Sequence, residues 1–217
     1  MSIIARDSSR IIREICGLAP VMPVLVVNEL KSAKPLAEAL VSGGIIALEV
    51  TLRTPVALDV IRAMSEVAGA HVGAGTLITA DDVRAAKQAG AKFGVSPGAT
   101  AELLSACEKE NLPLLPGVAT ASEAMKLLAR GYDVLKFFPA AASGGVTVLK
   151  ALSGPLPAID FCPTGGINAN TAASYLALDN VVCVGGSWLT PPDLLEQECW
   201  TEITKLANQA TKLADCR

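Results

Sequence analysis

Residues 43–55 read Gly-Gly-Ile-Ile-Ala-Leu-Glu-Val-Thr-Leu-Arg-Thr-Pro: a glycine pair, a short apolar run and a polar turn in direct succession. Glycines of this kind end helices, and an apolar run that stops at a turn predicts a buried strand. Within the run, Ile46, Leu48 and Val50 share one face, while Glu49 lies on the opposite face. The sequence therefore predicts a strand packed under helices on one side and carrying a carboxylate on the other.

Seven further apolar runs repeat this unit along the chain, with helical segments between them. Their starts lie about 20 to 27 residues apart, the length of one strand and one helix. The eight predicted strands cover residues 22–27, 45–50, 71–74, 92–95, 112–115, 134–138, 159–163 and 181–184. Eight such units predict an α/β fold, a (β/α)8 TIM barrel with an additional N-terminal helix over residues 3–16.

An open, doubly wound sheet is the alternative architecture. It would carry a Gly-x-Gly-x-x-Gly turn after its first strand, but residues 26–30, Val-Val-Asn-Glu-Leu, hold no glycine. The 217 residues show neither a linker nor a low-complexity tract. Because barrels of roughly 200 to 250 residues are ordinarily single domains, we expect one barrel domain over residues 1–217.

The composition argues against several classes of protein. Charged residues make up 18% of the chain and the net charge is −3, so there is no basic footprint for nucleic acid. No apolar stretch reaches the roughly 18 residues of a membrane-spanning helix, and charged residues between Arg6 and Glu14 interrupt the N-terminus before a signal peptide develops. We therefore expect a protein that binds neither nucleic acid nor a membrane.

The six cysteines are scattered without a Cys-x-x-Cys pair, which predicts reduced thiols in a cytoplasmic protein. They are Cys16, Cys107, Cys162, Cys183, Cys199 and Cys216. His71, the only histidine, falls at the start of a predicted strand, where we expect a structural role. One histidine and unclustered cysteines offer no familiar ligand spacing, so we expect neither a metal nor another cofactor.

Residues 133–139, Asp-Val-Leu-Lys-Phe-Phe-Pro, place Lys136 inside a predicted buried strand. Burial disfavours the charged form of an amine, and a neutral amine near pH 7 can attack a ketone to form a Schiff base. The alternative is a strand-end lysine that reaches solvent or pairs with a carboxylate. Lys92 also adjoins an apolar run, but it begins its strand. Lys136 is therefore the candidate nucleophile.

In a barrel, active-site groups lie at the carboxyl ends of the strands. Glu49 lies at such an end and points inward, toward whatever Lys136 faces. It is either a general acid and base tuned by burial or a structural counter-ion for Lys136 or Arg53. Arg53 follows in the loop, where its guanidinium either clamps a carboxylate through two parallel hydrogen bonds or is a solvated loop charge. Thr76 and Pro97 end the next two strands.

Two glycine pairs follow the last two predicted strands, in residues 163–168 (Pro-Thr-Gly-Gly-Ile-Asn) and 184–187 (Val-Gly-Gly-Ser). Tandem glycines let backbone N–H groups approach an anion. The first pair also precedes a helix that we expect to begin in residues 168–173, whose positive end favours phosphate. Each pair alone is compatible with a plain tight turn. Two pairs on consecutive strand ends favour a phosphate site, where barrel enzymes often have one.

With these motifs, the chain resembles the 2-keto-3-deoxy-6-phosphogluconate (KDPG) aldolase family, which includes 4-hydroxy-2-oxoglutarate aldolases. The matching segments are residues 44–54, 72–76, 94–98, 135–140 and 163–167. The most specific strings are Glu-Val-Thr-Leu-Arg-Thr and Lys-Phe-Phe-Pro-Ala, whereas the segment after Trp188 carries little family signature. The resemblance implies a class I, metal-independent aldolase on a (β/α)8 barrel, assembled as a homotrimer.

The resemblance also implies a role for each candidate residue. Lys136 is similar to the Schiff-base lysine and Glu49 to the acid and base, while Arg53 and Thr76 correspond to the holders of the pyruvate carboxylate. The apolar walls near the imine correspond to Pro97 and Phe138. The groups around the substrate hydroxyl and phosphate correspond to Thr164, Gly165, Gly166, Gly185, Gly186 and Ser187.

The reaction implied by the resemblance is cleavage of 2-dehydro-3-deoxy-6-phospho-D-gluconate to pyruvate and D-glyceraldehyde 3-phosphate, in the Entner–Doudoroff pathway. The alternatives within the same chemistry are cleavage of 4-hydroxy-2-oxoglutarate or of the galactonate-derived epimer. A different class of protein also stays open: a non-catalytic barrel that binds a phosphorylated metabolite, with Lys136 only a counter-ion for Glu49.

Overall fold

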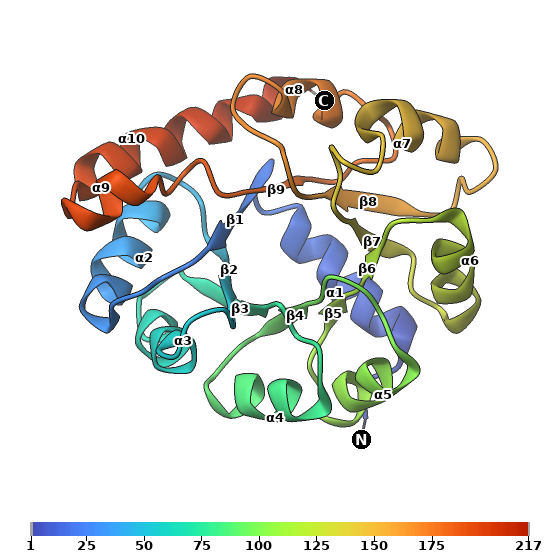
Figure 1. The fold of residues 1–217 in the computed structure, drawn as a ribbon, viewed down its shortest axis with the longest axis horizontal. Helices are drawn as coiled ribbons and strands as arrows, with labels where there is room; N and C mark the ends of the chain where they lie inside the picture. The colour runs from blue at the N-terminus through green and yellow to red at the C-terminus, as the bar shows by residue number, and fades with distance from the viewer. Residues whose placement is uncertain (1, 217) are drawn as a thin grey trace.

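Parallel strands form a ring that helices surround (Figure 1). The computed structural model describes residues 2–216. Six strands make one sheet in the order β5-β4-β3-β2-β1-β9, and three make a second in the order β6-β7-β8. The strands are β1 (Val21–Leu25), β2 (Ala47–Thr51), β3 (His71–Gly75), β4 (Phe93–Val95), β5 (Leu114–Leu115), β6 (Gly117–Val118), β7 (Val134–Phe137), β8 (Asp160–Pro163) and β9 (Val184–Gly186).

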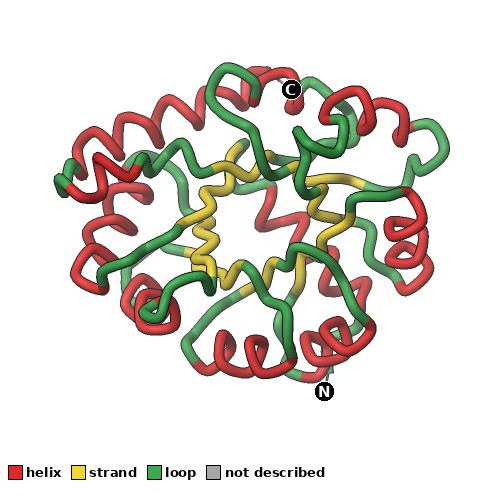
Figure 2. Tube along the Cα trace, in the orientation of Figure 1, coloured by secondary structure: helices red, strands yellow, loops and turns green. Residues whose placement is uncertain are grey.

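Two junctions join the sheets into a closed ring, which Figure 2 shows in yellow. Only Pro116, a residue that has no N–H to donate, separates β5 from β6, and β6 lies beyond the end of the strand predicted over residues 112–115. On the other side, parallel bridges from Phe161 to Val181 and from Thr164 to Gly185 connect β8 with β9. The predicted (β/α)8 barrel is confirmed.

Helices alternate with the strands and, apart from the N-terminal helix, cover the outside of the ring (Figure 1). They are α1 (Ala5–Cys16), α2 (Ala33–Ser42), α3 (Ala57–Ser65), α4 (Ala80–Gln88), α5 (Ala101–Lys109), α6 (Ala121–Arg130), α7 (Gly145–Ser153), α8 (Ala172–Leu176), α9 (Pro192–Glu196) and α10 (Trp200–Thr211), with 3₁₀ turns η1 (Leu30–Ser32) and η2 (Lys212–Cys216). The N-terminal helix begins two residues later than predicted. None of the helices in the described part of the chain has the length and hydrophobicity to span a membrane.

The strands separate two apolar layers, as the alternation in residues 45–50 predicts. Leu48 and Val50 belong to the larger layer, between the strands and the helices. Ala47 belongs to a smaller cluster that fills the inside of the ring with Phe93, Val95, Val134 and others. This inner cluster includes Ile12, Ile15 and Cys16 of α1. The N-terminal helix is therefore part of the barrel core.

Helix α1 covers one opening of the ring and supplies polar partners to the strands there. The Ser8 hydroxyl accepts a hydrogen bond from the backbone N–H of Leu114 at 2.9 Å, and the Ser9 hydroxyl accepts one from the N–H of Asp133 at 3.0 Å. Both bonds satisfy backbone N–H groups at the amino ends of strands, where the sheet provides no acceptor for them. Arg13 also pairs with Asp133, at 3.1 Å, and with Asp160.

We expect Ser8→Ala to lower the free energy of unfolding by about 1 to 3 kcal/mol, because the buried N–H of Leu114 loses its acceptor. Urea unfolding followed by circular dichroism measures the change. Ser122→Ala, at an exposed position on α6, is the control and should change stability by less than about 0.5 kcal/mol. Equal stability of the two variants would contradict the role assigned to α1.

Candidate active site

Lys136 on β7 and Glu49 on β2 form an ion pair inside the barrel, although 87 residues separate them in the chain. The Lys136 Nζ donates to Glu49 Oε1 at 3.2 Å, and the two side chains are only 7% and 2% exposed. Both residues lie at inward positions of their strands, which is what brings a lysine and a glutamate from distant strands together. A buried amine beside a buried carboxylate is an arrangement suited to imine chemistry with proton transfer.

The electrostatics of Glu49 follow from its burial. Desolvation raises the pKa of the Glu49 carboxyl above its usual value, while the nearby charges of Lys136 and Arg53 act in the opposite direction. The first effect is the largest, so the pKa is raised overall. A carboxyl whose pKa moves toward neutrality exchanges its proton more readily near pH 7, as a group that acts as acid and base in turn must do.

Of the two predicted apolar wall residues, Phe138 lies beside the Lys136 amine and Pro97 contacts a neighbouring strand. The Phe138 ring centroid lies 5.5 Å from Lys136 Nζ, and the same ring packs against the backbone of Gly165. Pro97 follows β4, and its carbonyl group approaches the α-carbon of Gly117 so closely that a side chain there would clash. Gly117 is in turn the β-sheet partner of Lys136. Phe138 thus borders the Lys136 amine, and Pro97 is connected to Lys136 through the backbone of Gly117.

The predicted carboxylate holders, Thr76 and Arg53, lie near Glu49 in different ways. Thr76 directly follows β3 and has a φ of 63°, a conformation that is an outlier for a β-branched residue. Backbone strain of this kind persists only where the surroundings impose it and often marks functional sites. Arg53 is exposed, and its guanidinium makes no hydrogen bond or ion pair with another described residue. It is therefore free to bind an anionic group.

The two glycine pairs differ from each other in conformation. Gly165 and Gly166 have φ values of 101° and 76°, so the first pair makes a turn that other residues would adopt only with strain. Gly185 and Gly186 instead lie within β9, so the prediction that they form a turn after the strand is wrong. Gly185 serves close packing, since the Thr164 side chain occupies the space that a Cβ would fill.

The helix predicted to begin in residues 168–173, after the first glycine pair, is confirmed and begins near the end of that range. Helix α8 starts at Ala172 and has five residues. Before it, the backbone N–H groups of Asn168 and Asn170 donate to the side chains of Thr171 and Asn168, at 3.1 and 3.0 Å. These donors are already used within the loop. The turn itself, rather than a helix beginning at Asn168, is what the structure offers to an anion.

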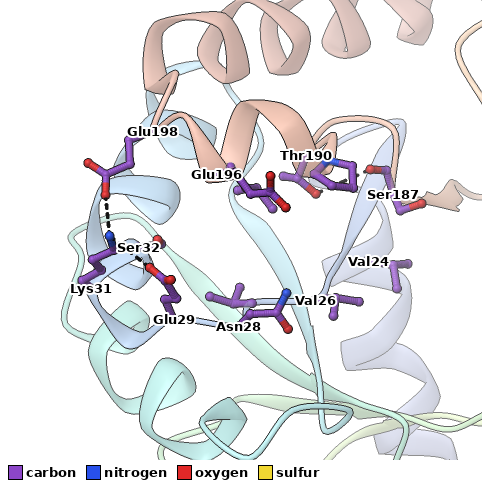
Figure 3. Close-up of a pocket in the computed structure, with 13 residues that line it drawn as sticks. Val24, Val26, Asn28, Glu29, Lys31, Ser32, Ser187, Thr190, Glu196 and Glu198 are labelled. Carbon is purple, nitrogen blue, oxygen red and sulfur yellow. Dashed lines mark hydrogen bonds and ion pairs between the residues drawn. The ribbon is translucent and has the colours of Figure 1, made fainter.

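A cavity of about 490 Å³ opens beside this site and extends toward η1 and α9 (Figure 3). Ser187 lines it, and so does Val24, which is the β-sheet partner of Glu49. The lining does not include Lys136 or Glu49, so the cavity adjoins the ion pair rather than containing it. The sequence prediction missed Val24. The signal was the alternation of β1, which puts Val24 on the same face as Met22, a member of the inner cluster.

The far end of the cavity is acidic. There Lys31 bridges Glu29 at 3.0 Å and Glu198 at 3.1 Å, as the dashed lines in Figure 3 show, and Glu196 lies nearby. Two carboxylates paired with one ammonium leave negative charge at this end. A phosphate is therefore disfavoured beside Lys31 and better accommodated at the opposite end, where Ser187 follows the second glycine pair.

Of the other residues noted in the sequence, His71 lies away from the ion pair, whereas Cys162 is the β-sheet partner of Lys136. His71 begins β3, where its ring stacks on Phe93 with 6.3 Å between centroids, and burial lowers the pKa of its imidazole, helped by the charge of the exposed Lys92. Cys162 and Cys183 lie inside the barrel as free thiols, and the Cys183 thiol donates a hydrogen bond to Cys162 Sγ at 3.3 Å. Among residues 2–216, no three His, Cys, Asp or Glu side chains form a group that could hold a metal ion.

A family model described as KDPG and KHG aldolase matches residues 12–206. The protein belongs to this family. A 2-dehydro-3-deoxy-phosphogluconate aldolase of Pseudoalteromonas atlantica is 51% identical to this aldolase over 199 residues, which cover 91% of this chain and 93% of that relative. The family predicted from the sequence motifs is confirmed.

Solved structures of two aldolases resemble this one over nearly their whole length. The KDPG aldolase of Legionella pneumophila, solved with pyruvate captured as a covalent carbinolamine intermediate, superposes with a TM-score of 0.89 at 48% identity, covering 92% of this chain and 97% of that one. The 2-keto-3-deoxy-6-phosphogluconate aldolase of Zymomonas mobilis, solved with 3-phosphoglycerate, gives 0.88 at 48% identity, with coverage of 94% and 96%.

We expect Lys136→Met to raise the pKa of Glu49 further, because it removes the cation that lowers this pKa and leaves the burial that raises it. The carboxyl should then take up its proton at a higher pH than in the unsubstituted aldolase. A ¹³C NMR titration of the side-chain carboxyl, assigned with Glu49→Gln, measures the change. Lys92→Met, at an exposed lysine, is the control. An unchanged or lower pKa in Lys136→Met would contradict the assigned coupling.

Proposed function

We propose that this aldolase cleaves 2-dehydro-3-deoxy-6-phospho-D-gluconate to pyruvate and D-glyceraldehyde 3-phosphate, the lyase step of the Entner–Doudoroff pathway, through a Schiff base on Lys136. The observation that carries the proposal is the buried Lys136 amine, 3.2 Å from the Glu49 carboxylate. The pyruvate adduct of the Legionella enzyme supports the proposed site for the pyruvate half of the substrate. The 3-phosphoglycerate complex of the Zymomonas enzyme supports a site for the phosphorylated half.

In the proposed mechanism, Glu49 takes a proton from the Lys136 ammonium and the freed amine attacks the C2 ketone. Glu49 then gives this proton to the carbinolamine hydroxyl, which leaves as water and produces an iminium ion. Glu49, through a water molecule, removes the proton of the C4 hydroxyl. The C3–C4 bond then breaks, its electrons pass into the iminium, and the aldehyde leaves. Glu49 returns a proton to C3 of the resulting enamine, and hydrolysis releases pyruvate and the free amine. Each cycle restores the carboxyl to its starting state.

The other candidate residues hold the substrate in this proposal. Arg53 and Thr76 bind the carboxylate of the pyruvate half, for which the unpaired guanidinium of Arg53 is suited. Pro97 and Phe138 form the apolar walls beside the imine. The hydroxyl and phosphate of the aldehyde half are bound by Thr164, Gly165, Gly166, Gly185, Gly186 and Ser187. The left-handed turn of the first glycine pair and the acidic far end of the cavity support this placement.

The family description also covers 4-hydroxy-2-oxoglutarate, which makes its cleavage a second candidate activity of the same site. That substrate has no phosphate to use the glycine pairs. The proposal further takes the chain as one barrel domain over residues 1–217, assembled as a homotrimer in the cytoplasm. The family resemblance supports the trimer, and the free thiols of the five cysteines whose side chains are described support a reducing compartment.

Incubation with pyruvate and borohydride should leave a stable adduct on Lys136, because hydride reduces the imine that the buried amine forms. Mass spectrometry of the digested protein locates the adduct. Lys136→Ala should carry none, while Lys92→Ala, at an exposed lysine at the amino end of the barrel, should be labelled like the unsubstituted protein. An adduct elsewhere, or unmodified Lys136, would overturn the catalytic role and favour a barrel that only binds a metabolite.

We expect Ser187→Ala to raise KM for the phosphorylated substrate by about tenfold, the effect of losing one hydrogen bond to a charged group, without changing KM for pyruvate in the condensation direction. Steady-state assays of both substrates measure the difference, with Ser122→Ala as the control. The KM for 4-hydroxy-2-oxoglutarate should also stay unchanged. Equal effects on phosphorylated and unphosphorylated substrates would mean that the anion binds elsewhere.

A further inference from the structure

Gly75, the last residue of β3, lies directly against the side chain of Glu49 on the neighbouring strand. A Cβ added at Gly75 would meet three Glu49 atoms below van der Waals distance: Oε1, Cγ at 2.7 Å and Cδ at 2.9 Å. The oxygen in this set, Oε1, is the one that accepts the hydrogen bond from Lys136 Nζ. The Glu49 side chain thus passes directly over the backbone of Gly75 as it extends from β2 toward Lys136 on β7.

Gly75 does not need to be glycine for its backbone conformation. Its φ lies outside the left-handed range, unlike that of Gly165 or Gly166. Its carbonyl accepts a hydrogen bond from the N–H of Leu52 at 2.9 Å, and Thr51 is its β-sheet partner, so the backbone is held as ordinary strand. What glycine provides here is space for the Glu49 side chain.

We propose that Gly75 is a positioning residue for proton transfer, because its missing side chain seats the Glu49 carboxylate within hydrogen-bond reach of Lys136. This inference rests on the role proposed for Glu49. Since the atoms that a Cβ would meet belong to the end of a flexible side chain, an added methyl group displaces the carboxylate rather than the fold. A displacement on the order of 1 Å at a catalytic group can reduce the rate about 10²-fold.

Gly75→Ala tests the proposal. We expect kcat to fall about 10²-fold while KM for the cleaved substrate stays within about twofold, because the substrate-binding groups do not move. Borohydride should still trap pyruvate on Lys136. The pKa of Glu49, from the ¹³C titration, should rise above that of the unsubstituted protein, since the carboxylate loses part of its interaction with the Lys136 ammonium. A merely structural role of Gly75 would not move that pKa.

Gly94→Ala is the matched control. Gly94 lies on β4, its φ is likewise outside the left-handed range, and an added Cβ would meet Leu77 Cδ1 at 2.5 Å. The steric stress is therefore similar, but it falls on a side chain of the outer apolar layer. We expect a comparable loss of thermal stability in the two variants and a kcat within about threefold of the unsubstituted protein for Gly94→Ala only.

A second substitution sharpens the test and relieves the clash if Gly75→Ala folds poorly. Glu49→Asp shortens the side chain by one methylene, so it withdraws the carboxylate from the added methyl group. We expect Glu49→Asp to lower kcat by a smaller factor in the Gly75→Ala background than in the unsubstituted one. Equal factors in both backgrounds, or equal kcat values for Gly75→Ala and Gly94→Ala, would overturn the proposal.

The failure of this inference is distinguishable from failure of the proposed function. An unsubstituted protein that neither cleaves the substrate nor traps pyruvate would overturn the function, and the ¹³C titration of Glu49 would still decide whether Gly75 positions the carboxylate. An unsubstituted protein that does both, with a Gly75→Ala variant of equal kcat and an unchanged Glu49 pKa, would overturn the role of Gly75 alone.

Discussion

The buried contact between Lys136 and Glu49 is the constraint on which the rest of the structure depends. Two charges removed from water are costly, and their mutual attraction offsets this cost only when the geometry is held closely. The barrel provides that geometry because each side chain points inward from a strand fixed by parallel neighbours on both sides. A protein selected only for stability would gain from apolar residues at both positions. A buried carboxyl whose pKa is raised by desolvation, despite the ammonium beside it, is better explained by reactivity.

Inside the ring, the residues at the amino end of the barrel are large and well packed, whereas those at the carboxyl end, near the ion pair, are small. Helix α1 closes the amino end with Ile12, Ile15 and Cys16, and its serines satisfy strand N–H groups there. Toward the carboxyl end the inward positions become small, with Gly75 beside Glu49 and Gly185 beside Thr164. Large side chains at the amino end of the ring support the ion pair, and small residues at the carboxyl end leave space beside it. The cavity that begins at Val24 and Ser187 extends this space toward α9.

Much of the site follows from strand alternation, which the sequence shows directly. The pattern of residues 45–50 is enough to place Glu49 inward, and residues 134–138 place Lys136 in a buried strand, so the two candidates were predictable individually. The errors lie where backbone conformation depends on neighbours. Gly185 and Gly186 look like a turn in sequence, yet β1 and the Thr164 bridge hold them as strand. Helix α8 begins at Ala172, inside the predicted range, but the N–H groups of Asn168 and Asn170 that the prediction offered to phosphate are used within the loop.

The sequence by itself determined the eight strand–helix units, their inward and outward faces, and the family, because side-chain periodicity and motifs are local properties of the chain. Only the tertiary structure decided which inward residues meet. Glu49 and Lys136 are 87 residues apart, and their contact exists because the ring closes. The missing side chain of Gly75 matters only because β3 lies beside β2, where the Glu49 side chain passes over Gly75. Contacts of this kind depend on the closure of the barrel, which no stretch of sequence encodes alone.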